Sequence, residues 1–106
     1  MPKFLIEASY SPEGVEGIKS KGGSSRRDAV VEMLEGLGGK LESFYFGFGD
    51  ADAYVTVDLP DNESAAAVAL AVNAAGAVTI KTVALLTPEE IDAAAKLSVA
   101  YRAPGS

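Results

Sequence analysis

The stretch FYFGFGDADAYVTVDLPD, residues 44–61, decides the fold of this chain. Aromatic and β-branched residues, which are enriched in strands, alternate with other residues on both sides of Gly49–Asp52. Tight turns prefer glycine and aspartate, because glycine adopts positive φ without steric cost and aspartate bonds its own backbone. We therefore predict a β-hairpin with strands over Lys40–Phe48 and Ala53–Leu59.

The residues nearest the N-terminus predict a strand followed by a short helix. Lys3–Tyr10 alternates in period two, as a strand does. Ser11 and Pro12 then supply an N-cap and a first helical residue, and Gly22-Gly23 is expected to break the helix that they begin.

A second helix is predicted before the hairpin, starting at Ser25 and ending at Gly38-Gly39. Ser25 and Asp28 have the spacing of a capping box. The run KSKGGSSRR, residues 19–27, is expected to be a solvated loop, as glycine-rich polar stretches usually are. The alternative is an anion site at Ser24, Ser25 and Arg26, since the amides at a helix N-terminus can hold an anion.

The residues after the hairpin predict a helix, a strand and a last helix. Asp61-Asn62 is expected to cap a helix that ends at Gly76, and a strand follows over Val78–Leu86. A capping box over Thr87–Glu90 begins a helix that we expect to run to about Val99. The tail, residues 101–106, is expected to fray.

The order of elements is that of an α+β, ferredoxin-like βαββαβ fold with an appended C-terminal helix. We expect the strand order 4-1-3-2 and one domain over residues 1–100. Strand parity places one set of side chains toward the helices: Phe4, Ile6, Ala8, Val55, Val57, Leu59 and Ile80. It places a mixed set on the opposite face: Leu5, Glu7, Ser9, Tyr54, Thr56, Asp58, Lys81, Val83 and Leu85. Because large apolar side chains on a sheet are seldom left in water, we predict a homodimer or higher homo-oligomer that packs sheet to sheet.

Composition excludes several classes of function. The chain is 48% hydrophobic and 23% charged, which is typical of a globular protein, and its net charge is −6. An acidic chain repels phosphate backbones and anionic lipid, so we expect neither nucleic-acid nor membrane binding. Without cysteine or histidine there is no disulfide, no usual zinc site and no nucleophile–histidine pair. We expect no metal and no cofactor, and a cytoplasmic protein.

Asp50 and Asp52 are the first candidates for chemistry. A calcium loop of the EF-hand type requires glycine at its sixth position, where this chain has Val55 in a strand. The turn chemistry of aspartate and glycine is the favoured interpretation. A role for Asp52 as a general base is the alternative.

Glu7 and Lys81 are expected on neighbouring strands of the face away from the helices. A cross-strand ion pair is the favoured interpretation. The alternative is that Glu7, covered inside an oligomeric barrel, acts as a general base or a ligand anchor. Tyr10, Tyr45 and Tyr54 each offer a hydroxyl to a ligand, and with Lys81 they are the candidate ligand-binding residues.

The segment GGKLESFYFGFGDADAYVTVDLPDNESAAA, residues 38–67, resembles the central part of the GYD domain family. The end of the first strand at Tyr10-Ser11 and the run LTPEE, residues 86–90, are also similar to that family, which would span roughly residues 1–98. The motif glycine falls on Gly49 and the motif aspartate on Asp52, while Ala51 stands where the family has tyrosine. The resemblance implies a dimeric α+β barrel and no settled reaction.

Two functions stay open. The first is an oligomeric α+β barrel module that binds a small molecule or supports assembly. The second is a cofactor-free enzyme, similar to monooxygenases or isomerases of this fold, that acts on a small apolar or aromatic substrate with Glu7 or Asp52 as base. The sequence favours the module, because the chain lacks histidine, the usual proton carrier at neutral pH.

Overall fold

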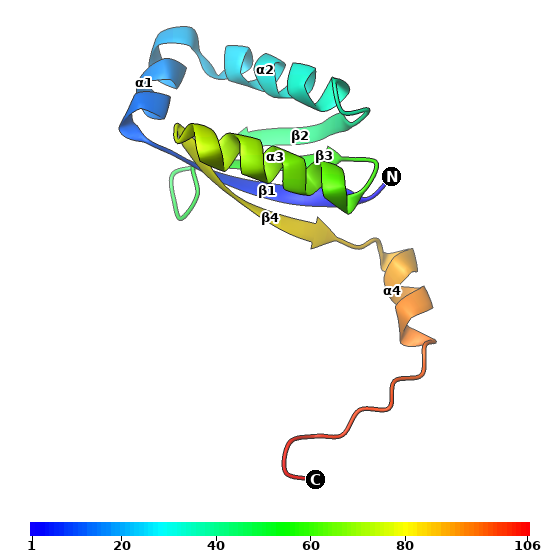
Figure 1. The fold of residues 1–106 in the computed structure, drawn as a ribbon. Helices are drawn as coiled ribbons and strands as arrows, with labels where there is room; N and C mark the ends of the chain where they lie inside the picture. The colour runs from blue at the N-terminus through cyan, green and yellow to red at the C-terminus, as the bar shows by residue number, and fades with distance from the viewer.

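The four strands form one antiparallel sheet in the predicted order. A computed structural model describes residues 1–106 (Figure 1). Its elements are β1 (Lys3–Tyr10), α1 (Pro12–Lys21), α2 (Gly23–Glu35), β2 (Lys40–Phe46), β3 (Ala53–Asp58), α3 (Asn62–Ala75), β4 (Val78–Leu85) and α4 (Pro88–Ala95). The sheet order β2-β3-β1-β4 is the predicted 4-1-3-2, and every neighbouring pair is antiparallel. The α+β fold is therefore confirmed, and its arrangement is compatible with the ferredoxin-like class.

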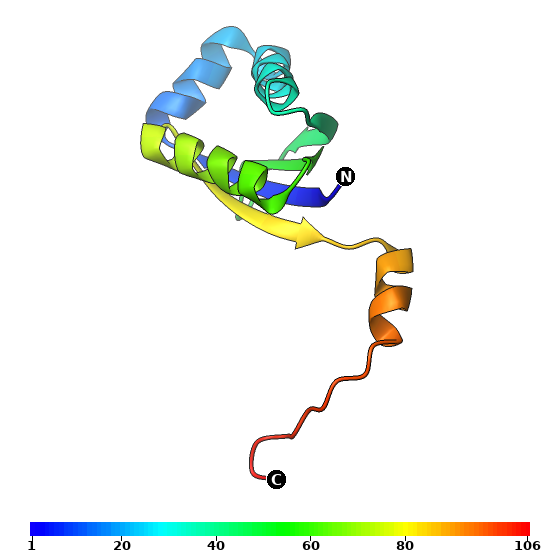
Figure 2. The ribbon, with the colours of Figure 1, turned by 45° about the vertical axis from the view of Figure 1, so that its right-hand side comes forward.

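The helices cover one face of the sheet. α2 packs on β2 and α3 packs on β4, while α1 joins the end of β1 to α2 (Figure 2). Every side chain that strand parity placed toward the helices is buried. The largest fully buried side chains are Leu34 from α2, Val57 from β3 and Leu59 from the residues after β3. The alternation of the strands thus determines which face holds the core.

Three predicted helix starts are present. The Ser11 hydroxyl accepts a hydrogen bond from the Gly14 N–H at 3.1 Å, and Asp61 Oδ1 accepts one from the Ser64 N–H at 2.8 Å. At the start of α4, Thr87 and Glu90 form the reciprocal capping box that satisfies two free amides of the first turn.

The predicted capping box of Ser25 and Asp28 is wrong. Gly22, with φ of 89°, ends α1 and is also the N-cap of α2, which has no side-chain cap. Because α2 starts at Gly23, Ser25 lies inside its first turn and cannot cap it. The predicted loop over residues 19–27 is therefore also wrong: apart from Gly22 these residues are helical.

Several other boundaries differ from the prediction. α2 ends at Glu35, and Gly38, with φ of 75°, turns the chain so that the Gly39 N–H bonds the Leu34 carbonyl at 2.8 Å. β2 ends at Phe46, two residues early, because the Gly47 N–H bonds the Asp52 carbonyl at 2.8 Å and closes a longer loop. β3 and β4 each end one residue before the predicted position.

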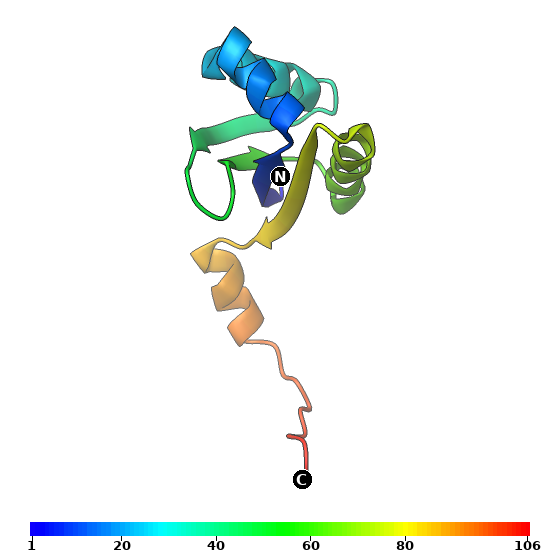
Figure 3. The ribbon, with the colours of Figure 1, turned by 90° about the vertical axis from the view of Figure 1, so that its left-hand side faces the viewer.

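α4 lies away from the sheet and its helical layer (Figures 1 and 3). It ends at Ala95 and not at Val99, since serine and β-branched valine are weak helix formers and no packing supports the last turn. The radius of gyration is 16.8 Å, whereas a compact chain of this length has about 13 Å. No helix has both the length and the apolar character needed to cross a membrane.

Candidate functional site

The sheet face opposite the helices carries its side chains in rows set by the strand register. One row holds Ser43, Thr56, Leu5 and Val83, and the next holds Tyr45, Tyr54, Glu7 and Lys81. No member of the mixed set predicted for this face is buried. We call it the open face. It brings four of the predicted site residues into one line across all four strands.

Glu7 lies at the centre of that line, with Tyr54 on one side and Lys81 on the other. Although Glu7 and Lys81 are direct register partners, no ion pair joins them, so the predicted cross-strand ion pair is absent from this structure. Tyr45 is 72% exposed and lies beside Tyr54. The line therefore offers two hydroxyls, one carboxylate and one ammonium group to whatever covers the sheet.

The ion pairs of the open face lie at the other end of the sheet. Lys3 Nζ donates to Asp58 Oδ1 at 2.9 Å and also to Glu42, which stands at a bulge in β2. These two hydrogen bonds, first that to Glu42 and then that to Asp58, raise the pKa of Lys3. Next to this cluster, Ser43 and Thr56 share a hydrogen bond between their hydroxyls.

Asp52 has a structural role in the loop after β2. Its Oδ2 accepts a hydrogen bond from the Tyr10 N–H at 2.9 Å, and its own N–H donates to the Ala8 carbonyl at 2.8 Å. These contacts hold the end of the loop against the end of β1. The hairpin-corner interpretation of this aspartate therefore has direct support in its hydrogen bonds.

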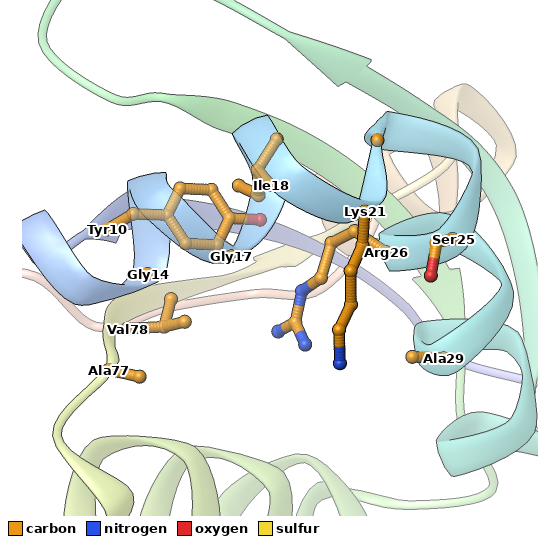
Figure 4. Close-up of a pocket in the computed structure, with 11 residues that line it drawn as sticks. Tyr10, Gly14, Gly17, Ile18, Lys21, Ser25, Arg26, Ala29, Ala77 and Val78 are labelled. Atoms are coloured by element: carbon orange, nitrogen blue, oxygen red, sulfur yellow. The ribbon is translucent and has the colours of Figure 1, made fainter.

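A cleft of about 290 Å³ lies on the helix side, between α1, α2 and the start of β4 (Figure 4). It is lined by Tyr10, Gly14, Gly17, Ile18, Lys21, Gly22, Ser25, Arg26, Ala29, Ala77 and Val78. We call it the helix-side cleft. Three of the predicted site residues, Tyr10, Ser25 and Arg26, meet there, whereas Ser24 is not part of the lining.

The helix-side cleft is positively charged. Lys21 and Arg26 both extend into it (Figure 4). Neither residue takes part in an ion pair, and no acidic residue lines the cleft. The guanidinium carbon of Arg26 lies 5.9 Å from the centre of the Tyr10 ring, which is within the range of a cation–π contact. Its Nε is buried and has no hydrogen-bond partner.

A smaller apolar cavity of about 30 Å³ lies next to the cleft, between α2, α3 and the sheet. Tyr10, Arg26 and Val78 line both spaces. The other residues around this cavity are apolar, among them Val30, Met33, Phe44 and Val72. A polar mouth with an apolar interior is the usual composition of a small-molecule site.

Lys21 is the member of the cleft that sequence reasoning missed. The run of basic residues at positions 19–27 signalled a positive patch, but not which of its cations share one space. The corner at Gly22 joins the last turn of α1 to the first turn of α2, and Lys21 and Arg26, one from each turn, line the same cleft. No group of three or more aspartate, glutamate, cysteine or histidine residues in this structure could hold a metal ion.

Comparison with known proteins identifies the family of this chain. The family model described as GYD domain matches residues 4–95, which cover the sheet, the helices over it and α4. The chain belongs to the GYD domain family. The resemblance, which rested on residues 38–67, the end of β1 and residues 86–90 of this GYD domain protein, is thereby confirmed. Neither the curated proteins nor the solved structures include a match.

Proposed function

We propose that this GYD domain protein is a homo-oligomeric module that binds a small molecule, with its subunits packed open face to open face. The observation that carries the proposal is the mixture of side chains on that face. Leu5 and Val83 form an apolar pair between a row of polar groups and the two tyrosines. A second copy of the same face would cover these apolar groups and would also offer hydrogen-bond partners to the polar rows.

The dimensions of the open face support this arrangement. With about 4.8 Å between strands and 3.3 Å per residue, four strands of up to eight residues span about 19 by 26 Å. Two such faces therefore remove on the order of 1,000 Å² from water, which is about the lower limit for a specific interface. Tyrosine, which is enriched at protein interfaces, stands at two adjacent positions of the face.

α4 gives independent support. It has eight residues, none of them buried, whereas isolated helices shorter than about 12–15 residues are only marginally stable in water. Large apolar side chains in and beside it are exposed: Leu86, Ile91, Leu97, Val99 and Tyr101. A neighbouring subunit is the cover that would stabilise this segment.

The helix-side cleft is the place where we expect the small molecule. It is formed within one chain and combines charged and apolar lining. The alternative of a carboxylate-based enzyme has less support. Asp52 accepts a hydrogen bond from the backbone of Tyr10, and Glu7 lies on the opposite face of the sheet from the cleft.

Sedimentation velocity of the 106-residue chain and two variants tests the assembly. Val83→Glu adds a negative charge to the open face. In a two-fold interface both subunits would bury this charge, so we expect the dissociation constant of the assembly to rise at least about tenfold. Leu70→Glu is the matched control, because Leu70 is 74% exposed on α3, in the helical layer. A monomeric parent chain, or equal effects of the two substitutions, would contradict assembly through the open face.

A further inference from the structure

We propose that the ligand of the helix-side cleft is a small organic carboxylate with a compact apolar body. This inference rests on the proposed function only in taking the cleft as a ligand site. It names the chemical class that the cleft recognises and the two side chains that hold the charged group, Lys21 and Arg26.

The charge of the cleft calls for an anion. The chain carries 15 acidic and 9 basic residues, so a space lined by two cations and no carboxylate departs from its overall character. Of the nine basic residues, two have acidic partners: Lys3 bonds Asp58 and Glu42, and Arg27 pairs with Asp28 at 3.4 Å. Lys21 and Arg26 form no ion pair, as is also true of the other five, but these two share one cleft. An anion in the cleft would therefore meet two cations and no opposing carboxylate.

The orientation of Arg26 favours a carboxylate. Its guanidinium lies over the ring of Tyr10, which restricts the side chain before any ligand binds. A guanidinium presents donors in a planar fork that matches the two oxygens of a carboxylate. The two terminal nitrogens of Arg26 stand at the end of the side chain in the cleft, where the oxygens of a carboxylate can accept from both (Figure 4). Ser25, from the uncapped first turn of α2, adds a hydroxyl to the same lining.

The remaining walls and the size of the cleft indicate the polarity and the size of the uncharged part of the ligand. Ile18, Ala29 and Val78 are apolar and stand around the two cations. The volume of about 290 Å³ is at the lower end for ligand sites, which favours a small anion. The neighbouring apolar cavity, at about 30 Å³, has room for only about one water molecule, so the apolar body of the ligand must lie against the walls of the cleft itself.

NMR titration of the 106-residue chain tests this ligand class. The probes are benzoate, phenylacetate and 3-methylbutanoate, each compared with its primary amide, which has the same shape and no charge. We expect the carboxylates to change the chemical shifts of the backbone N–H groups of Gly22, Ser25 and Ala77 in a saturable way. The neutral primary-amide ligands should bind at least about tenfold more weakly, because they lack the charge-assisted contact.

Two neighbouring arginines give a matched pair of variants. Arg26→Gln should weaken carboxylate binding about tenfold or more, since it removes the charged fork from the cleft. Arg27→Gln removes the same charge one residue away, from a side chain that is 53% exposed and outside the lining, and should change binding less than twofold. Lys21→Gln should lie between the two, because Lys21 supplies a point charge without the fork.

Three results would overturn the proposal. The first is that no carboxylate shifts the cleft amides more than its neutral amide does. The second is that Arg26→Gln and Arg27→Gln have the same effect. The third is that inorganic phosphate binds as tightly as the carboxylates, because the apolar walls would then contribute nothing. Sedimentation of the same samples separates the ligand class from the assembly. An oligomer that does not bind carboxylates refutes the ligand class alone, whereas a monomer refutes the assembly.

Discussion

Two glycines of α1 should respond in opposite ways to the same substitution. Gly14 and Gly17 both line the helix-side cleft from one helix. A Cβ added at Gly17 would meet no atom within 4 Å, whereas one added at Gly14 would lie 2.6 Å from the carbonyl oxygen of Ala77. That carbonyl is fixed, because it accepts a hydrogen bond from the Ser11 N–H at 3.0 Å.

The size of the effect follows from these distances. Alanine in place of a helical glycine reduces the entropy of the unfolded chain, so Gly17→Ala should stabilise the protein by about 0.5–1 kcal/mol. Gly14→Ala has a similar entropic gain. However, the distance from its Cβ to the Ala77 carbonyl oxygen must increase from 2.6 Å to the ordinary 3.4 Å, so the backbone must shift by about 0.8 Å. Overpacking of this kind costs about 1–3 kcal/mol, and this cost is the expected difference between the two variants.

Urea unfolding monitored by circular dichroism measures that difference at one protein concentration. We expect the midpoint to rise for Gly17→Ala and to fall for Gly14→Ala, with the same slope for both. If Gly14→Ala proves as stable as Gly17→Ala, the close contact between α1 and Ala77 is wrong, and so is the wall of the helix-side cleft that it fixes.

Three more outcomes are expected. Leu34→Ala should destabilise the fold by about 2–5 kcal/mol in urea unfolding, because this side chain is fully buried, while Leu37→Ala, at 37% exposure, should cost much less. Hydrogen bonds from the side chain and the N–H of Ser64 hold the pKa of Asp61 below its ordinary 3.8. As the pH falls, Asp61 is therefore protonated first in the unfolded chain. Its contribution to the free energy of unfolding is present above about pH 4 and is lost at lower pH. Asp61→Asn keeps a capping side chain without the titrating carboxyl group. The midpoint temperature of its thermal unfolding should therefore fall less steeply with decreasing pH than that of the parent chain. Gly17→Leu should fill the cleft and abolish carboxylate shifts in NMR while the fold is retained.

The sheet could be predicted from sequence because its signals are local. Alternation in Lys3–Tyr10 and Ala53–Leu59 assigned each side chain to a face, and the register of β1 with β3 and β4 then grouped the open-face residues as expected. The caps at Ser11, Asp61 and Thr87 were also readable, since each depends on residues within one turn.

The helix-side cleft could not be predicted in the same way. It depends on the corner at Gly22 and on the approach of Gly14 to Ala77, which joins residues 63 positions apart in the chain. A glycine pair signals a break but does not give the angle between the two helices. The prediction therefore found Arg26 and Ser25 but took their segment for a loop, and it left out Lys21.

Native mass spectrometry of the 106-residue chain, purified without added ligand, is the most direct test of an oligomeric ligand-binding module. We expect a dimer or larger species that carries a small extra mass per chain, retained in Arg27→Gln and lost in Arg26→Gln. A pure monomer at every concentration, with the bare mass of the chain, would contradict both parts of the account.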